Sequence, residues 1–199
     1  GGVDTVYSQI LGTYSLDAGN TLENLVLLGV ANNNANGNGL NNQITGNAGD
    51  NSMTGGGGND VFEGARGNDS ITGGTGDTVY IYSRNDGMDT ITDTGGSDIL
   101  QLGDDIDLTQ VWFTHTGNNL DISLIGTTDK ITVVNWYSSV PANHIEKITT
   151  LSGYSLDHDS VETLVQAMAA ITPQPVGETD LRPENYDALE LTFFSTWQS

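Results

Sequence analysis

A nine-residue repeat limits the folds open to this chain more than any other feature of its sequence. Glycine recurs every nine residues, and a large apolar residue follows each of these glycines by seven positions. The glycines are Gly37, Gly46, Gly55, Gly64 and Gly73, and the apolar residues are Ile44, Met53, Phe62, Ile71 and Tyr80. A helix repeats every 3.6 residues, so a fixed spacing of nine indicates repeated loop and strand units instead.

Each block devotes about six residues to a glycine-rich loop and three to a short strand. In the strand only the middle side chain points inward, so one apolar residue per block stacks on its neighbours. A disordered linker would also be rich in Gly and Asn, but it would not hold an apolar residue at one phase five times. The pattern therefore predicts an all-β solenoid.

The charge of the chain is strongly negative and points to a cation. Asp and Glu number 26 against 5 Lys and Arg, a formal net charge of −21. This balance excludes nucleic acid as a partner and opposes compaction unless cations neutralise it, although a merely soluble acidic surface has the same composition. Cysteine is absent, so oxygen atoms and His115, His144 and His158 are the available metal ligands. No apolar run approaches the ~18 residues of a membrane span, and we expect no membrane insertion.

Two blocks carry a recognisable motif. GGGGNDVFE at 55–63 and GARGNDSIT at 64–72 fit the nonapeptide G-G-x-G-x-D-x-U-x, where U is a large apolar residue. They resemble the calcium-binding repeats of RTX proteins. The resemblance implies a calcium-bound parallel β-roll in which two blocks form one coil and loops two blocks apart stack on one edge. The Asp60 loop should then face residues 73–78, and the Asp69 loop should face Asp86 and Asp89.

Calcium prefers six to eight oxygen ligands, which glycine-loop carbonyls and a carboxylate at the sixth position can supply. We expect two to four ions between residues 55 and 98, with Asp60, Asp69, Asp89 and Asp98 as the main carboxylates. Asn42 and Asn51 stand where an acid is expected, so any site there is weak or absent. The candidate metal-site residues are Gly55, Gly56, Gly57, Gly58, Asp60, Gly64, Arg66, Gly67, Asp69, Gly73, Gly74, Thr75, Gly76, Asp77, Asp86, Asp89 and Asp98.

The roll is expected to have flanking parts. Residues 1–36 form N-terminal cap strands, with apolar side chains at Leu22, Leu25, Leu27 and Val30, and residues 37–105 form the roll itself. The chain opens at Gly1 within a recognisable pattern, so we interpret it as a fragment of a larger protein.

The C-terminal half should continue as β structure and end in helix. Residues 106–158 form a β-rich capping module, in which GTTDKITVVNWY at 126–137 and HIEKI at 144–148 resemble the haemolysin-type calcium-binding related module. Residues 159–199 hold a helix at 161–171, capped by Asp159 or Ser160, then a linker with Pro173, Pro175 and Pro183. The stretch 186–199 could form a second helix, and it resembles the end of type I-secreted RTX proteins.

These resemblances imply a secreted or surface-displayed domain that folds on meeting extracellular calcium. The expected partners are calcium ions and the type I secretion machinery, namely an ABC transporter, an adaptor and an outer-membrane channel. We expect a monomer, and the parent protein is most simply an adhesin.

Two other classes of function are alternatives for this sequence. Asp157, His158 and Asp159 form an acid–base cluster, but no nucleophile elbow, zinc motif or phosphate loop accompanies it, so we do not expect an enzyme. Any catalytic domain, such as that of a hydrolase, epimerase or toxin, should precede Gly1.

A ligand- or carbohydrate-binding module is the second alternative. The third loop position shows no regular row, which argues against an ice-binding face; it reads Gly39, Ala48, Gly57, Arg66 and Thr75. Trp112, Trp136 and Tyr137 could form a sugar platform, though strand aromatics more often belong to the core. Three aromatic residues lie near the C-terminus, namely Phe193, Phe194 and Trp197. They could pack on the domain, but we slightly favour the alternative that they belong to an export signal.

Overall fold

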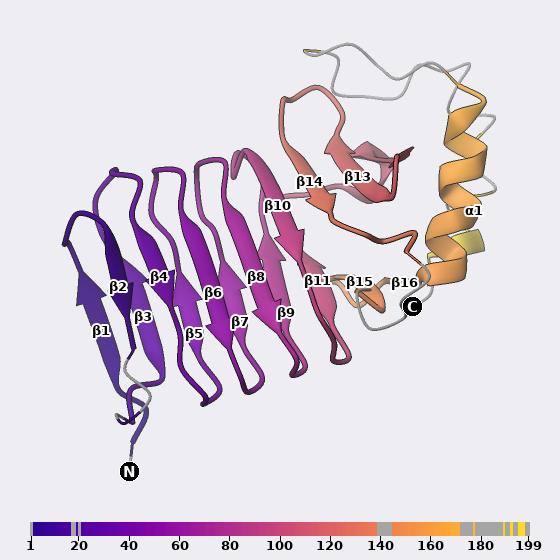
Figure 1. Cartoon of the computed structure of the whole chain (residues 1–199). Helices are drawn as coiled ribbons and strands as arrows, with labels where there is room; N and C mark the ends of the chain where they lie inside the picture. The colour runs from indigo at the N-terminus through magenta and orange to yellow at the C-terminus, as the bar shows by residue number, and fades with distance from the viewer. Residues whose placement is uncertain are drawn as a thin grey trace.

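Two eight-stranded sheets make up most of the computed structural model (Figure 1), which describes residues 2–16, 19, 21–138, 145–171, 177, 189, 192 and 195–197. In order, the first sheet contains β1 (Thr5–Ser8), β3 (Asn24–Leu27), β5 (Gln43–Thr45), β7 (Val61–Glu63), β9 (Val79–Tyr82), β11 (Ile99–Leu102), β15 (Lys147–Thr150) and β16 (Ser155–Asp157). The second contains β12 (Val111–Thr116), β13 (Asn119–Leu124), β14 (Lys130–Val133), β10 (Met88–Thr92), β8 (Ser70–Gly74), β6 (Ser52–Gly56), β4 (Asn34–Asn36) and β2 (Thr13–Ser15). From β1 to β11 successive strands alternate between the sheets, so two blocks complete one coil and the predicted parallel β-roll is confirmed.

The pairing register measures the length of each coil. Ile44 lies beside Phe62 and Met53 beside Ile71, a step of 18 residues, which is two nonapeptides. The step grows to 20 residues where Tyr80 lies beside Leu100 and Ile71 beside Ile91. The coil therefore lengthens from about residue 80 onwards, which is where the sequence repeat becomes irregular.

A narrow apolar core lies between the two sheets. From β3 to β9 each strand of the roll buries at least one apolar side chain, and Leu25, Ile44, Met53 and Phe62 are all fully buried. The rings of Phe62 and Tyr80 stack, with centroids 5.9 Å apart. Burial of a large apolar side chain contributes roughly 1.5–3 kcal/mol, and each of these coils offers only two or three of them. The core of the roll is thus small for its surface.

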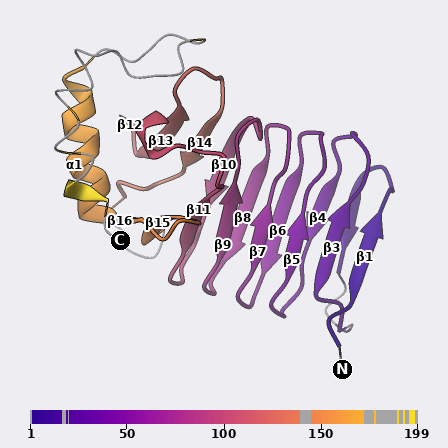
Figure 2. The ribbon, with the colours of Figure 1, turned by 180° about the vertical axis from the view of Figure 1, so that it is seen from behind.

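The C-terminal half continues both sheets of the roll. β14 pairs in parallel with β10, and β15 pairs in parallel with β11, so the expected boundary after residue 105 does not separate two sheets. β12, β13 and β14 then form an antiparallel meander, preceded by a short 3₁₀ helix, η1 (Leu108–Gln110). The helix α1 (His158–Ala169) packs on β12 and β16, away from the N-terminal coils (Figure 2).

Two details of the sequence prediction are corrected. The helix begins at His158, not at residue 161, because Asp157 is its cap: the Ser160 N–H donates to Asp157 Oδ1 at 2.9 Å. Val30 is 78% exposed, since β3 ends at Leu27 and Val30 lies in the following turn.

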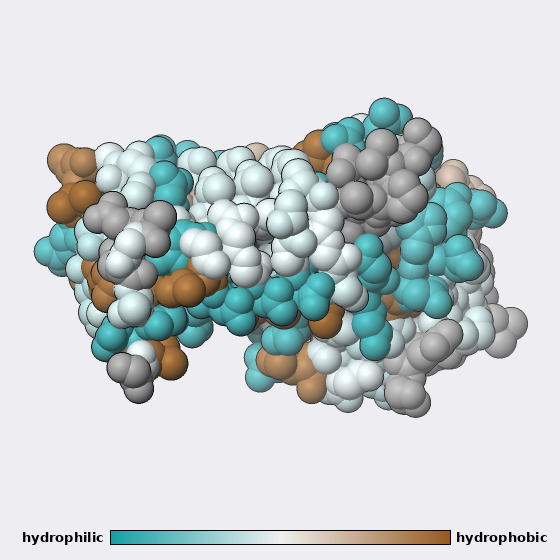
Figure 3. All heavy atoms as spheres, turned by 60° about the horizontal axis from the view of Figure 1, so that its bottom comes forward, coloured by the Kyte–Doolittle hydropathy of each residue, from teal (hydrophilic) through white to brown (hydrophobic). Residues whose placement is uncertain are grey.

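Part of the C-terminal prediction lies outside the described residues. This holds for Pro173, Pro175 and Pro183, for Phe193 and Phe194, and for most of the stretch 186–199. Among the helices that the structure describes, none is long and apolar enough to cross a membrane. Along the roll the surface is mostly teal and white in Figure 3, because polar residues and glycine dominate its loops.

Candidate calcium-binding loops

The loops between strands form two rows, one on each edge of the roll. We call edge A the row containing loops 46–51, 64–69 and 83–87, and edge B the row containing loops 37–42, 55–60, 73–78 and 93–98. On edge A the Gly67 N–H donates to the Asp86 carbonyl at 2.8 Å, and on edge B the Val79 N–H donates to the Asp60 carbonyl at 2.9 Å. The loops that the sequence pairs two blocks apart are therefore in contact.

The sixth residue of each loop forms a hydrogen-bonded ladder along its edge. On edge A the Asn51 N–H donates to Asp69 Oδ1 at 2.7 Å, and the Asp69 N–H donates to Asp89 Oδ1 at 2.9 Å. On edge B the Asn42 N–H donates to Asp60 Oδ1 at 2.8 Å. One oxygen of each carboxylate is thus fixed by the main chain of the neighbouring coil, which positions the other oxygen.

The second oxygen of these carboxylates is buried without a hydrogen bond. This is the case for Asp60 Oδ2, Asp69 Oδ2 and Asp98 Oδ2. A buried carboxylate oxygen without a partner is costly, and a cation is the group that removes this cost. These orphaned oxygens therefore fit the calcium ligands implied by the sequence.

The first glycine of the loop provides the space for such an oxygen. A Cβ at Gly55 would overlap Asp60 Oδ2 and would lie 2.7 Å from the carbonyl oxygen of Gly73 in the next coil. Gly64 has the same relation to Asp69 Oδ2. A carboxylate oxygen and, at Gly55, a main-chain carbonyl thus converge where a side chain would otherwise stand, and hard oxygens of this kind are what calcium binds.

Burial raises the pKa of the ladder carboxylates. The pKa of Asp60 rises to about 6, that of Asp69 to about 7 and that of Asp89 to about 8, in each case chiefly because burial removes water from the charged form. The pKa of Asp86 rises to about 6 for the same reason. Without a cation the folded roll therefore disfavours the ionised form of the groups that a cation would bind.

The remaining ligands would be main-chain atoms. Among the described residues no three acidic or imidazole groups converge into a metal-binding cluster. An ion with six to eight oxygen ligands would therefore take most of them from loop carbonyls. Asp60, Asp69, Asp89 and Asp98 would hold the ions, which would neutralise the buried carboxylates and join successive coils.

Other predicted site residues lie elsewhere in the loops. Asp77 is exposed, and its Oδ1 accepts a hydrogen bond from the Ser97 N–H at 2.9 Å, in a second ladder formed by the fifth loop residues. Asp86 is buried, with Oδ2 accepting from the Ser83 N–H at 2.7 Å. The side chains of Arg66 and Thr75 are exposed at the third loop position. These two residues could offer an ion only their main chain.

The first coils replace the carboxylate by an amide. Asn51 Nδ2 donates to the Asn33 carbonyl at 2.8 Å, and its Oδ1 accepts from the Asn47 N–H at 2.8 Å. Asn42 Nδ2 donates to the Glu23 carbonyl at 3.1 Å. The amides of Asn42 and Asn51 thus donate hydrogen bonds to main-chain carbonyls of the preceding coil. Direct hydrogen bonds therefore join the N-terminal coils where the later coils have buried carboxylates.

Sequence reasoning missed three acidic residues near the end of the roll. Asp93 is buried and accepts a hydrogen bond from the Tyr80 hydroxyl. Asp129 accepts from the Asn85 N–H at 2.7 Å, and Glu146 from the Asp98 N–H at 2.6 Å. Asp93 stands first in the loop DTGGSD, where earlier loops have glycine, and that substitution was the available signal.

The aromatic and histidine candidates have structural surroundings. Trp112 and Trp136 are 5% and 0% exposed, so they belong to the core rather than to a sugar platform. His158 stacks on Trp136, with ring centroids 5.3 Å apart, and His115 contacts Tyr137 with the rings tilted by 36° and their centroids 3.7 Å apart. His144 lies outside the described residues.

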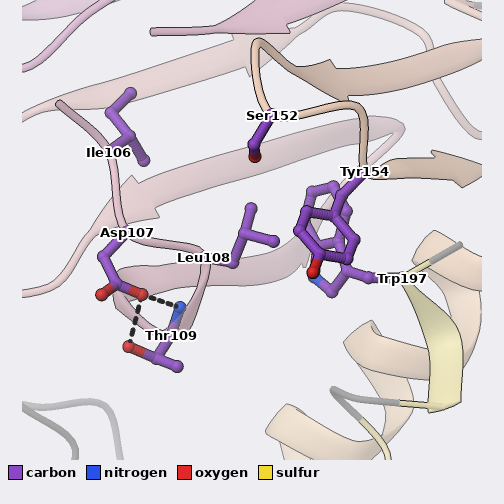
Figure 4. Close-up of a pocket in the computed structure, with 7 residues that line it drawn as sticks. All are labelled: Ile106, Asp107, Leu108, Thr109, Ser152, Tyr154 and Trp197. Atoms are coloured by element: carbon purple, nitrogen blue, oxygen red, sulfur yellow. Dashed lines mark hydrogen bonds between the residues drawn. The ribbon is translucent and has the colours of Figure 1, made fainter. Parts of the chain in front are cut away.

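Trp197 docks on the domain instead of facing solvent. It is 7% exposed and lies beside Tyr154 at a pocket that Ile106 and Leu108 also line (Figure 4). For this residue the docked alternative, which the sequence favoured less, is the observed one.

Two family models match this chain. The RTX calcium-binding nonapeptide repeat (4 copies) matches residues 36–71 and 54–77. The haemolysin-type calcium binding protein related domain matches residues 119–160. The first match covers the coils whose ladders change from Asn42 and Asn51 to Asp60 and Asp69, and the second covers β13 to β16 and the start of α1.

Proposed function

Since the chain is an RTX protein that binds calcium through its repeats, we propose that it is a folding switch serving type I secretion of a larger extracellular or surface protein. The observation that supports this proposal is the set of buried carboxylate oxygens without partners at Asp60, Asp69 and Asp98. Without calcium these groups oppose the coiled state, and the small core has little apolar burial to offset them. With calcium they join neighbouring coils.

The linkage between calcium binding and folding gives the free energy by which calcium stabilises the folded chain. An ion that binds only the folded state stabilises it by RT ln(1 + [L]/Kd). With a Kd of ~10⁻⁴ M, typical of the tighter extracellular modules, millimolar calcium contributes about 1.4 kcal/mol per site, and submicromolar calcium contributes almost nothing. Two to four such sites would shift the folding equilibrium by several kcal/mol between the cytosol and the outside of the cell. The chain would then pass a secretion channel unfolded and fold afterwards.

The larger protein carries the activity in this proposal. The Asp157, His158 and Asp159 cluster serves structure, because Asp157 caps α1 and His158 stacks on Trp136. We therefore propose a non-catalytic module, and an adhesin as the parent, secreted or held at the cell surface.

The proposal is tested by far-UV circular dichroism of the chain, stripped with EDTA and titrated with calcium or magnesium. We expect β-sheet signal and a cooperative transition near millimolar calcium, and neither with magnesium. Asp60→Asn with Asp69→Asn should move the midpoint at least tenfold higher. Asp77→Asn is the matched control, because Asp77 is an acid of the same region that lies exposed outside the buried ladder. A stripped chain that is folded and indifferent to calcium would contradict the proposal.

A further inference from the structure

We propose that the outer face of the second sheet binds an extended, uncharged polysaccharide. This binding function goes beyond the proposed folding switch, and the residues that carry it lie outside the calcium loops. The face is formed by β2, β4, β6, β8 and β10, which follow one another along the roll (Figure 1). In each of these strands two side chains point outward, one on either side of a side chain that points into the core.

The outward side chains form two columns that cross the strands, as the pairing register shows. The first column consists of Thr13, Asn34, Ser52, Ser70 and Thr90. The second column consists of Ser15, Asn36, Thr54, Thr72 and Thr92. Neighbouring strands lie ~4.8 Å apart, and two residues along a strand span about 7 Å. The ten side chains, all Ser, Thr or Asn and all exposed or half-buried, therefore form a regular grid.

The first sheet shows that folding of the roll does not require this composition. Its strands have the same two outward positions, yet these hold Tyr7, Val26, Val61, Glu63 and Ile81 among others. Glu63 lies beside Ile81 in the register, as Thr54 lies beside Thr72 on the second sheet. The nonapeptide leaves both positions open. The restriction to hydroxyl and amide side chains thus belongs to one face of the roll, which indicates a requirement for contact with a ligand.

The hydroxyls at the centre of the grid are available for a ligand. Six of them form no hydrogen bond with any described residue, namely those of Ser52, Thr54, Ser70, Thr72, Thr90 and Thr92. At the N-terminal end Asn36 Nδ2 donates to Ser15 Oγ at 3.1 Å. At the other end the grid stops at β14, where the Thr132 hydroxyl donates to Asp121 Oδ1 at 2.7 Å. The free hydroxyls are therefore grouped on β6, β8 and β10.

The chemistry of the grid selects a neutral ligand that is rich in hydroxyl groups. A Ser or Thr hydroxyl both donates and accepts a hydrogen bond, as a sugar hydroxyl does. None of the ten side chains is charged, so the grid itself has no group that would attract a cation. The net charge of −21 repels anionic glycans.

The spacing of the grid favours a polymer over a single sugar. The ~4.8 Å between strands is close to the distance between successive sugar units in an extended polysaccharide. One polysaccharide chain can therefore lie along the roll and contact several strands at once. Contacts that are weak singly then combine, because each further contact is made within the same complex.

The test measures adsorption of the full chain to microcrystalline cellulose and to chitin in millimolar calcium. Replacing Thr54, Thr72 and Thr92 together by valine removes three hydroxyls and keeps the β-branched shape. The roll accepts valine after a buried residue, since Val26 has that position on the first sheet. We expect the triple variant to bind at least tenfold more weakly than wild type. Thr45→Val is the matched control, because Thr45 has the same position in its block on the first sheet, and it should bind as wild type does.

Competition by soluble polymers tests the argument from charge. Hydroxyethyl cellulose should displace the chain from cellulose, and the anionic carboxymethyl cellulose should not. Equal competition by the two polymers would contradict recognition by an uncharged face.

Adsorption of wild type to neither cellulose nor chitin would overturn the proposal. An equal loss of binding in Thr45→Val and in the triple variant would overturn it as well. Circular dichroism in calcium checks that each variant is folded, and Ser70→Ala with Thr90→Ala, in the other column, replaces the triple variant if that one is not. The calcium titration of wild type tests the folding switch separately, because a folded roll presents this face whether or not calcium causes the folding.

Discussion

A single methyl group at Gly55 should impair calcium binding by filling the space in which two oxygens converge. In Gly55→Ala the new Cβ would overlap Asp60 Oδ2 and lie 2.7 Å from the Gly73 carbonyl, so it would displace the two oxygens expected to face the ion. The backbone of Gly55 is not in the left-handed region, so alanine brings no conformational strain. Loss of the ion removes about 1.4 kcal/mol in millimolar calcium, and steric overlap adds roughly 1–3 kcal/mol.

Gly57→Ala is the matched control within the same loop. A Cβ at Gly57 has only the Gly39 Cα nearby, at 3.8 Å, and its backbone is also outside the left-handed region. The assay is urea unfolding in about 1 mM calcium, the concentration at which one ion contributes about 1.4 kcal/mol. We expect the unfolding free energy of Gly55→Ala in calcium to fall by about 2–4 kcal/mol, and that of Gly57→Ala to stay within about 1 kcal/mol of wild type. Equal effects of the two substitutions would refute the assignment of Gly55 to an ion site.

Three further outcomes follow from the structure. In EDTA the folded population should be larger at pH 5 than at pH 8, because folding raises the pKa of Asp69 to about 7 and that of Asp89 to about 8, so the folded state binds more protons than the unfolded chain over this range; a far-UV circular dichroism signal of β-sheet that grows as pH rises would contradict this. Asn51→Asp should lower stability in millimolar calcium by about 1–3 kcal/mol, since the Asn33 carbonyl loses its donor, and a further rise in calcium should restore part of it; the check is the urea midpoint at low and at high millimolar calcium, and no loss at the lower concentration would refute the amide's role. Asp157→Ala should cost about 1 kcal/mol by removing the cap of α1, seen as a lower Tm in saturating calcium, and an unchanged Tm would exclude Asp157 as a contributing cap.

The repeat made much of the fold predictable. A fixed phase of nine residues specifies which side chain of each strand is buried, and Ile44, Met53 and Phe62 are buried as expected. The stacking of loops two blocks apart follows from the same phase. Local patterns also predicted a helix near residue 161, but its first turn depends on whether Asp157 or Asp159 supplies the cap, and both are plausible from sequence.

The C-terminal end of the roll was less predictable because it depends on contacts distant in sequence. β14 returns to β10 and β15 to β11, and neither pairing carries a nine-residue signal. For the same reason Glu146 was missed, since its partner Asp98 lies 48 residues earlier. Asp77 was included as a site residue because it stands one place from the sixth position, yet that one-residue shift moves its side chain from the buried ladder to the exposed one.

Calcium should convert an extended chain into the coiled roll, and small-angle X-ray scattering measures that conversion directly. A chain of 199 residues has a radius of gyration of ~48 Å when unfolded and ~16 Å when compact, with a somewhat larger value for an elongated roll. We expect a radius of gyration near the unfolded value in EDTA and a drop below ~25 Å in millimolar calcium, with no such drop in magnesium. A compact particle of the same radius in EDTA and in calcium would contradict it.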